Sequence, residues 1–322
     1  MLDATAHEAL WLLECHLLKP DLPLTWLQPE WPAPATVRAV MTDRHGGVSV
    51  LPYGSMNLGD HVGDRPDAVA LNRSRLQAVL QRRPVFLQQV HGVHCVALDA
   101  ATADGTAADA CLATTPDVAC TIMVADCLPV LFCDAQGTWV AAAHAGWRGL
   151  AGQGGVGVLE RVLASLPSRS KTNTDILAWL GPCIGPQAFE VGEEVRAAFC
   201  DADAQADVCF VPHSEGKFLA DLAGLARQRL HGMGITRIYG NDSQAAWCTA
   251  SQASRFFLSP ARQPGPGAIR PHGRLHLVGA VMPMVHFEPL GLVLVCEFLC
   301  VAKACHPGTP PATSATRHTA RT

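Results

Sequence analysis

The stretch that decides the fold runs Trp139-Val-Ala-Ala-Ala-His144-Ala-Gly-Trp-Arg148-Gly149. Its first half is a run of small apolar residues, which predicts a strand over residues 139–143. The strand runs into a glycine turn, and glycine is typical of positions where the chain changes direction. His144 and Arg148 therefore carry reactive side chains at a place where a strand meets a turn.

Two earlier stretches repeat this combination of a strand, a turn and reactive side chains. One is Gln88-Gln-Val-His91-Gly92, the end of a β-rich run. The other is Val124-Ala-Asp126-Cys127-Leu-Pro129, in which an acid and a thiol interrupt a β-rich run. With His144, these stretches supply two histidines, one cysteine and one aspartate.

Two imidazoles and one thiolate match the ligand set of a catalytic zinc centre, which has three protein ligands and an open fourth position. Such soft ligands suit zinc or copper rather than magnesium or calcium. His91, Cys127 and His144 are therefore the candidate metal ligands. Their wide separation along the chain also fits a simpler interpretation, in which Cys127 is a buried core thiol and each histidine is hydrogen-bonded at a strand end.

Strand and helix patterns alternate irregularly along the chain. Further strands are predicted at residues 37–42, 85–90, 95–98, 120–124, 130–133, 176–180 and 235–239. Helices are predicted at residues 67–83, 154–166, 193–199 and 218–230, with Asp221 in the first turn of the last. Since no regular strand–helix–strand rhythm is present, we expect an α+β layered domain instead of a doubly wound sheet.

The composition divides the chain into three parts. Residues 1–35 hold three tryptophans among several prolines and are expected to form an irregular leader. Residues 36–258 show no break in composition and are expected to form one domain. Residues 259–322 begin with a proline- and glycine-rich run and end in small polar residues, so we expect an atypical, partly disordered tail.

The overall composition excludes several classes of protein. With 322 residues, of which 49% are hydrophobic and 16% charged, the chain is too apolar to be disordered. A net charge of −4 argues against sequence-independent binding of nucleic acid. The 13 cysteines form no CxxC pair and no basic segment follows Met1, so we expect a reducing, cytoplasmic setting. The longest apolar stretch, residues 290–301, is too short to span a membrane.

Two arginines lie beside glycines in predicted loops. Arg44 and Arg148 suit the recognition of phosphate or carboxylate, because a guanidinium forms paired hydrogen bonds with such anions. Ordinary salt bridges within the loops explain them equally well. The glycine-rich run at residues 149–157 can cradle an anion, but it lacks the lysine of a nucleotide-binding loop. The pattern assigns no role to Asn57, a polar residue in an early loop.

Several strings in a set order give a more specific indication. They are Thr42-Asp-Arg-His-Gly-Gly-Val-Ser, Met56-Asn-Leu-Gly-Asp-His-Val-Gly-Asp, Gln89-Val-His-Gly, Ala125-Asp-Cys-Leu-Pro-Val-Leu, Ala143-His-Ala-Gly-Trp-Arg-Gly, Trp179-Leu-Gly-Pro-Cys-Ile-Gly-Pro, Phe189-Glu-Val-Gly-Glu-Glu-Val and Cys248-Thr. Together they closely resemble the laccase-domain family. Its members are now described as purine nucleoside phosphorylases and were formerly described as multicopper polyphenol oxidases, and one bacterial branch is the peptidoglycan editing factor. The resemblance covers residues 37–257.

The resemblance implies a fold and a metal. The family's fold is a single-domain, mixed-sheet α+β sandwich of the cysteine-hydrolase-like type, with a zinc ion held by two histidines and a cysteine. By position these ligands are His91, Cys127 and His144, so the resemblance favours the metal centre over the simpler interpretation. Copper is the alternative metal for the same ligand set.

The resemblance also implies an activity with purine nucleosides and phosphate as partners. Family members cleave adenosine, inosine and 5′-methylthioadenosine with phosphate, and they deaminate adenosine. Phosphorolysis needs an anion clamp and electrostatic help for the departing purine, and deamination needs a metal-activated water. Arg44 and Arg148 are the candidate clamp, and Asn57 is a candidate contact to sugar or base. Asp126 is a candidate to shuttle a proton or to orient a ligand, so Cys127, Asp126 and Arg148 are the candidate catalytic residues.

The tail departs most from the family pattern. After Arg255-Phe-Phe257 the family's Ser-aromatic-Arg-Arg string is replaced by Leu258-Ser-Pro-Ala-Arg. We hypothesise that a frameshift or another replacement produced this tail, which predicts the loss of an arginine pair and of the terminal strand of a sheet. The other reading frames of the gene after the Phe257 codon test this hypothesis, because absence of the string from every frame contradicts it.

Three other functions stay open from the sequence. The editing branch suggests a hydrolase of cell-wall precursors that uses Cys127 as its nucleophile. A copper-dependent phenol oxidase is disfavoured, because one set of two histidines and a cysteine cannot supply a multi-copper cluster. The third is an inactive family member with a structural zinc. The preferred nucleoside, the physiological metal and the oligomeric state are also open.

Overall fold

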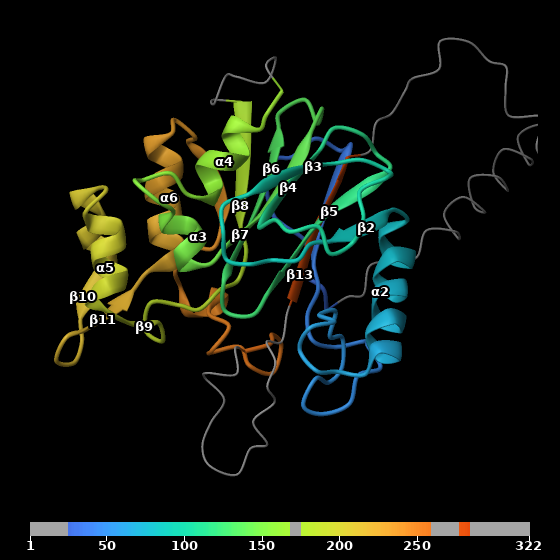
Figure 1. The fold of residues 1–322 in the computed structure, drawn as a ribbon, viewed down its shortest axis with the longest axis horizontal. Coiled ribbons are helices and arrows are strands. Elements are labelled where there is room, and N and C mark those ends of the chain that lie inside the picture. Colours follow the sequence, from blue (N-terminus) through green and yellow to red (C-terminus); the bar gives the residue numbers. More distant parts are fainter. Residues whose placement is uncertain (1–24, 168–174, 259–276, 284–322) are drawn as a thin grey trace, which may run out of the picture. The chain divides into compact units, whose positions relative to one another are not determined.

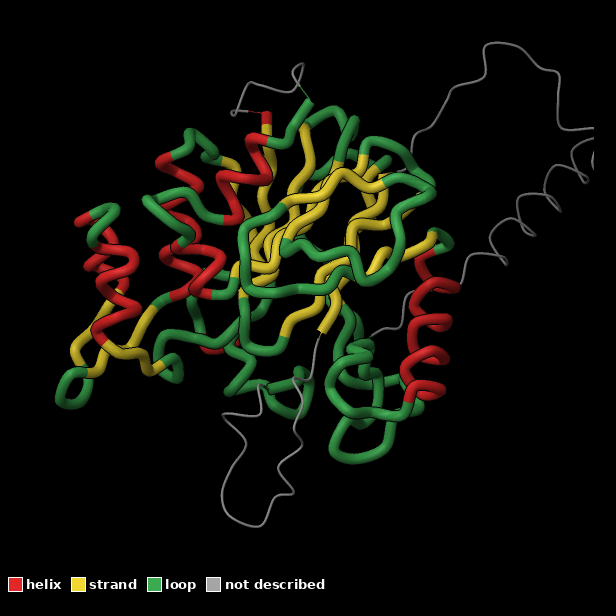
Figure 2. The backbone as a smooth tube through the Cα atoms, in the orientation of Figure 1, coloured by secondary structure: helices red, strands yellow, loops and turns green. Residues whose placement is uncertain are grey.

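The computed structural model describes residues 25–167, 175–258 and 277–283, whose arrangement is shown in Figures 1 and 2. The predicted leader is described from residue 25 on, where Trp26 is buried and Leu27 forms a β-bridge with Met41. Of the predicted tail only residues 277–283 are described, and the rest of 259–322 lies outside the described residues.

The larger of the two central sheets has six strands. In spatial order they are β12 (Arg237–Gly240), β8 (Ile176–Leu180), β6 (Leu128–Asp134), β7 (Val140–Ala145), β4 (Ala110–Ala113) and β3 (Cys95–Leu98). The three inner pairs are antiparallel, and the two outer pairs, β12–β8 and β3–β4, are parallel. Every residue of β4, β6, β7 and β8 is buried, because these apolar strands are covered on both faces.

The second central sheet has four strands. In spatial order they are β1 (Val37–Met41), β13 (Leu277–Pro283), β5 (Val118–Val124) and β2 (Arg83–Phe86). The two sheets pack face to face, since Leu131 and Trp179 of the larger sheet belong to the same apolar core as Val85 and Ile122 of the smaller one. This packing makes the molecule a β-sandwich at its centre.

Helices cover the outer faces of both sheets (Figures 1 and 2). The larger sheet carries α3 (Trp147–Ala151), α4 (Val158–Ala164), α5 (Glu193–Cys200) and α6 (Leu222–Gly232). The smaller sheet carries α2 (Pro66–Leu80), whose Leu76 packs with Phe86. Within the described ranges, no helix combines the length and the apolarity needed to cross a membrane. The four layers are therefore helix, sheet, sheet and helix, which confirms the predicted α+β sandwich.

A small third sheet and two short helices complete the described elements. The sheet has the order β10 (Phe210–Pro212), β11 (Lys217–Ala220) and β9 (Glu190–Gly192). The short helices are η3 (Ala204–Cys209) and η4 (Ala245–Trp247). None of these elements carries a predicted site residue.

Several predicted boundaries are wrong for local reasons. Residues 218–220 belong to β11 instead of the following helix, because Asp221 caps that helix by accepting a hydrogen bond from the Gly224 N–H at 2.8 Å. Helix α2 ends at Leu80 because Gln81 adopts a left-handed φ of 55°. The turn predicted after His144 is helical over α3, and the short strand β4 was not predicted.

Strand β13 corrects one expectation about the tail. Its backbone pairs antiparallel with β1 on one side and β5 on the other, with Ala280 opposite Val40 and Thr121. Residues 277–283 of the tail therefore supply a central strand of the four-stranded sheet, where a missing strand was expected. How the tail arose stays a hypothesis.

Candidate metal centre

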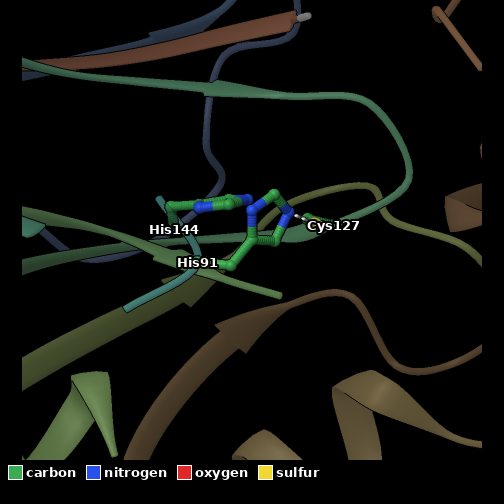
Figure 3. A group of neighbouring side chains, drawn as sticks. All are labelled: His91, Cys127 and His144. Carbon is green, nitrogen blue, oxygen red and sulfur yellow. Dashed lines mark hydrogen bonds between the residues drawn. The ribbon is translucent and has the colours of Figure 1, made fainter. Parts of the chain in front are cut away.

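The structure brings His91, Cys127 and His144 together (Figure 3). One potential ligand atom from each residue lies within 4.8 Å of the other two. The Cys127 Sγ is 3.9 Å from the His91 Nε2, and the two imidazole rings meet edge-on with centroids 4.7 Å apart. Three residues that are distant in sequence thus present two nitrogens and a sulfur to one point.

Strand ends and left-handed turns place these three side chains. His91 follows β2 and has a φ of 59°, and Asp126, which directly precedes Cys127, has a φ of 72°. The angle at Asp126 reverses the chain at the turn that leads from β5 of one sheet into β6 of the other, and the angle at His91 turns the chain between β2 and β3. Side chains alternate along β7, so His144 points to the same side as Val140 and Ala142, toward the smaller sheet. The cluster therefore lies at the junction of the two sheets.

A buried aspartate that the sequence analysis missed holds two of these residues. Asp109 directly precedes β4 and is 0% exposed. One of its carboxylate oxygens, Oδ1, is 2.8 Å from the His144 Nδ1 and accepts a hydrogen bond from the His91 backbone N–H at 2.8 Å. The sequence does contain a signal for Asp109, because this acid directly precedes a short run of small apolar residues. A charge buried beside such a run needs a partner, since burial of an unpaired charge costs free energy.

The cluster perturbs the ionisation of its own members. Burial favours the neutral thiol of Cys127, but the charge and hydrogen bond of His144, with the hydrogen bond of His91, lower its pKa to about 6. Burial disfavours the charged form of His144, yet Cys127 and Asp109 outweigh it and raise its pKa to about 9. Burial likewise opposes charge on Asp109, but His144 and backbone N–H groups keep its pKa below the ordinary value. A cation is therefore favoured beside the thiolate.

The donor set and the space around it fit a metal ion. Zinc–ligand bonds of about 2.0–2.3 Å place tetrahedral ligand atoms roughly 3.3–3.8 Å apart, close to the 3.9 Å between Cys127 Sγ and His91 Nε2. Gly146 leaves the space clear, since a β-carbon there would lie 3.0 Å from the Cys127 Sγ and 3.1 Å from the His91 Cδ2. Two imidazoles and a thiolate suit zinc or copper, and the geometry does not choose between them.

Asp126 is buried beside the cluster and bonded to another loop. Its carboxylate accepts a hydrogen bond from the Thr249 hydroxyl at 2.7 Å, and its backbone carbonyl accepts one from the Ile184 N–H at 2.9 Å. These contacts hold the left-handed turn that presents Cys127. A part in proton transfer stays a prediction for Asp126.

Arg148 is exposed on α3, two residues after Gly146. Its guanidinium lies over the ring of Trp147, with 4.3 Å from the guanidinium carbon to the ring centroid. Because Gly146 touches the cluster, this short helix carries Trp147 and Arg148 beside the candidate metal centre. The arrangement suits an anion clamp, which stays a prediction.

Arg44 and Asn57 are engaged in the structure of their own loops. The Arg44 guanidinium donates hydrogen bonds to the carbonyls of Gly54 and Ala253, at 3.1 and 2.8 Å. Asn57 is 0% exposed, and its amide bonds to Gly59 and Asp64. Contacts of these two residues with phosphate, sugar or base stay predictions, and the structure shows structural tasks for both.

Comparison with known proteins shows the family of this chain. Residues 38–266 match the family described as multi-copper polyphenol oxidoreductase laccase. A purine nucleoside phosphorylase of Pseudomonas aeruginosa is 53% identical over 233 residues, which are 72% of this chain and 91% of that protein. Purine nucleoside phosphorylase YfiH of Escherichia coli is 49% identical over 231 residues, 71% of this chain and 90% of that protein.

Solved structures show the same fold. A Neisseria meningitidis protein of the family DUF152 superposes with a TM-score of 0.70 at 41% identity, over 80% of this chain and 99% of its own. YlmD from Geobacillus stearothermophilus superposes with a TM-score of 0.67 at 27% identity, over 83% of this chain and 99% of its own. The sandwich described above is therefore shared with proteins of known structure.

Proposed function

The chain belongs to the multi-copper polyphenol oxidoreductase laccase family, and from this premise we propose that it is a purine nucleoside phosphorylase with zinc bound by His91, Cys127 and His144. The proposed substrates are adenosine, inosine and 5′-methylthioadenosine, with deamination of adenosine as a side activity. The observation that carries the proposal is the convergence of the three side chains within 4.8 Å, in a chain about half identical to proteins named purine nucleoside phosphorylase.

The reaction exchanges one bond at the anomeric carbon of the ribose. A phosphate oxygen forms a bond to C1′ while the bond from C1′ to the purine nitrogen breaks, and the purine leaves with the electron pair and takes up a proton. The positive charge of Arg148, exposed beside the cluster, holds the phosphate and orients it toward C1′. When bound, zinc supplies a Lewis acid that stabilises negative charge.

The other polar residues of the site support these groups. Asp109 and the left-handed turn at His91 hold the two imidazoles in place. Asp126, fixed by Thr249, holds the turn that presents Cys127 and is the proposed proton carrier for the departing base. Arg44, the second candidate for the anion clamp, is proposed to contribute positive charge from its own loop.

The test is base release from adenosine and inosine, with and without phosphate, measured by mass spectrometry with Cys127→Ala protein as control. Phosphate-dependent release of adenine and hypoxanthine, lost in the variant, is the expected result. Inosine formed from adenosine without phosphate reports the deaminase activity. A folded protein with about one zinc per chain and no turnover of any nucleoside contradicts the proposal and indicates an inactive, zinc-binding family member.

One observation favours a second candidate function. The pKa of Cys127, lowered to about 6, makes the thiolate available as a nucleophile at neutral pH. A hydrolase that edits cell-wall precursors would use this thiolate directly. Removal of metal by a chelator separates the two functions, since hydrolysis by a thiolate survives the treatment and zinc-dependent phosphorolysis does not.

A further inference from the structure

The carboxylate of Asp109 faces four potential hydrogen-bond donors. Oδ1 lies 2.8 Å from the His91 backbone N–H nitrogen and 2.8 Å from the His144 Nδ1. Oδ2 accepts hydrogen bonds from the backbone N–H groups of Gly92 at 2.7 Å and Val90 at 3.2 Å. Three of these four donors belong to the peptide backbone and cannot change their role.

These contacts decide which nitrogen of His144 carries a proton. Three backbone N–H groups stabilise the ionised carboxylate, which has no proton to donate. The His144 Nδ1 lies at hydrogen-bond distance from that carboxylate and must therefore be the donor. In the neutral imidazole the lone pair is then on Nε2. This nitrogen borders the same space as the Cys127 Sγ, since a β-carbon placed on Gly146 would lie 3.7 Å from the Nε2 and 3.0 Å from the Sγ.

The same carboxylate holds the second histidine through its backbone. His91 has a φ of 59°, in the left-handed region that few residues other than glycine adopt. The three N–H groups of residues 90–92 converge on Asp109, which fixes this turn and with it the position of the His91 ring. Asp109 is also joined to His144 through the backbone, because its carbonyl accepts the His144 N–H at 2.7 Å.

We propose that Asp109 is the positioning residue of the metal centre, which sets the His144 tautomer and the His91 turn so that both imidazoles face the metal before it binds. The inference rests on the zinc centre of the proposed function and adds a residue that the sequence analysis did not identify. Carboxylates that hold metal-binding histidines in this way typically change metal affinity by about 10- to 100-fold.

The Asp109→Asn variant tests this with little change in volume. An amide NH₂ in place of Oδ1 faces the His91 N–H and the His144 Nδ1, and in place of Oδ2 it faces the N–H groups of Gly92 and Val90. Either orientation sets donors against donors or forces His144 into the other tautomer. The matched control is Asp134→Asn, since Asp134 is also a buried acid, lies at the far end of the strand after Cys127, and its carboxylate accepts hydrogen bonds from the backbone N–H and the hydroxyl of nearby Thr138.

Zinc affinity is measured by competition with a chromophoric chelator, and cobalt is used to record the thiolate charge-transfer and d–d bands. We expect Asp109→Asn to bind zinc about 10- to 100-fold more weakly than the parent protein and to show shifted cobalt bands. We expect Asp134→Asn to bind zinc with an affinity within about threefold of the parent value. Parent affinity and spectrum in folded Asp109→Asn overturn the proposal.

A second measurement needs no variant. Nitrogen-15 NMR of the zinc-loaded parent protein is expected to show a slowly exchanging proton on the Nδ1 of His144 and metal bound at Nε2. Metal bound at Nδ1 overturns the proposal even where the Asp109→Asn protein does not fold. Neither readout uses nucleoside turnover, so a protein that passes both tests and releases no base refutes the proposed function and leaves the role of Asp109 intact.

Discussion

Cys127 differs from other described cysteines in its neighbours more than in its burial. Burial raises the pKa of Cys95 and of Cys133 to about 12, and at Cys133 the charge of Arg237 offsets this effect only in part. Two histidines reverse this effect at Cys127 and lower its pKa to about 6. The chemistry of the site therefore begins with the pairing of one thiol and two imidazoles.

This difference predicts selective alkylation of the metal-free protein. The iodoacetamide reaction of Cys127 is expected to be half-maximal near pH 6 and to fall about tenfold per pH unit below it, because the protonated thiol is unreactive. Cys95 and Cys133 are expected to stay unmodified at pH 7. Peptide mass spectrometry after timed labelling measures this, with zinc-loaded protein as control. Equal labelling of all three cysteines at pH 7 contradicts the prediction.

Gly146 gives a second prediction at the scale of one residue. A methyl group in Gly146→Ala lies 3.0 Å from the Cys127 Sγ, so we expect zinc affinity to fall at least about tenfold, the cost of a misplaced ligand. The φ of −64° at this position accepts alanine, so the substitution adds the contact with the two ligand side chains and no backbone strain. Gly232→Ala, with nothing within 4 Å of the new carbon, is the control. Unchanged zinc affinity in Gly146→Ala contradicts the prediction.

The sequence predicted the cluster members and missed the residue that holds them. Their chemical types made His91, Cys127 and His144 candidate ligands, but the spacing also fitted a core thiol with hydrogen-bonded histidines, and the family resemblance decided for the metal centre. Asp109 acts through backbone N–H groups of residues 90–92, and only the fold brings those groups to it. The family resemblance suggested a contact to sugar or base for Asn57, and the structure shows local hydrogen bonds of its amide to Gly59 and Asp64.

At the scale of elements, α3 carries the candidate anion clamp. This five-residue helix begins directly after Gly146 and carries Trp147 and the exposed Arg148. We expect Arg148→Ala to raise the KM for phosphate about 10- to 100-fold, the worth of a charged hydrogen bond, and to leave the nucleoside KM nearly unchanged. Arg161→Ala, an exposed arginine on α4, is the control in steady-state assays. A phosphate KM equal in both variants argues against the clamp.

Strand β13 gives the second prediction at this scale. It lies between β1 and β5, so both of its backbone edges are engaged. Ala280→Pro removes an N–H from this ladder, and the loss is expected to cost about 1–3 kcal/mol or more of unfolding free energy. Urea unfolding measures it, with Ala280→Ser, which keeps the N–H, as control. Equal stability of the two variants would mean that the strand contributes little.

Element types were predicted better than their ends. Strand β8 was predicted with its observed bounds, because an apolar run is confined between polar and glycine residues. The four residues of β4 are too few for a periodic signal, and β13 lies beyond residues 37–257, on which the family resemblance rests. Both strands owe their conformation to the sheets that they complete, a tertiary effect that local pattern does not record.

At the scale of the whole molecule, the candidate metal centre joins the two sheets. His91 follows a strand of the smaller sheet, His144 lies in the larger sheet, and Cys127 lies in the turn between the two. A metal bound by all three opposes separation of the sheets, so it stabilises the folded state by mass action.

This arrangement predicts a large effect of zinc on thermal unfolding. At free zinc 1,000-fold above its Kd, the added stability is about 4 kcal/mol, which corresponds to a rise of roughly 10 °C in Tm for a fold of this size. Differential scanning calorimetry with and without zinc measures the rise, and Cys127→Ala is expected to lose most of it. A rise that persists in Cys127→Ala places the stabilising metal elsewhere.

The late position of β13 in the sequence also determines when the four-stranded sheet can be completed during translation. About 240 residues separate β1 from its partner β13, so a ribosome adding 5–20 residues per second finishes β13 roughly 10–50 s after β1. From the completion of β5 at Val124 to that of β13 at Pro283, the edges of β1 and β5 lack the strand that lies between them. For about half of its translation the nascent chain therefore carries two unpaired strand edges, which are open to pairing with another chain.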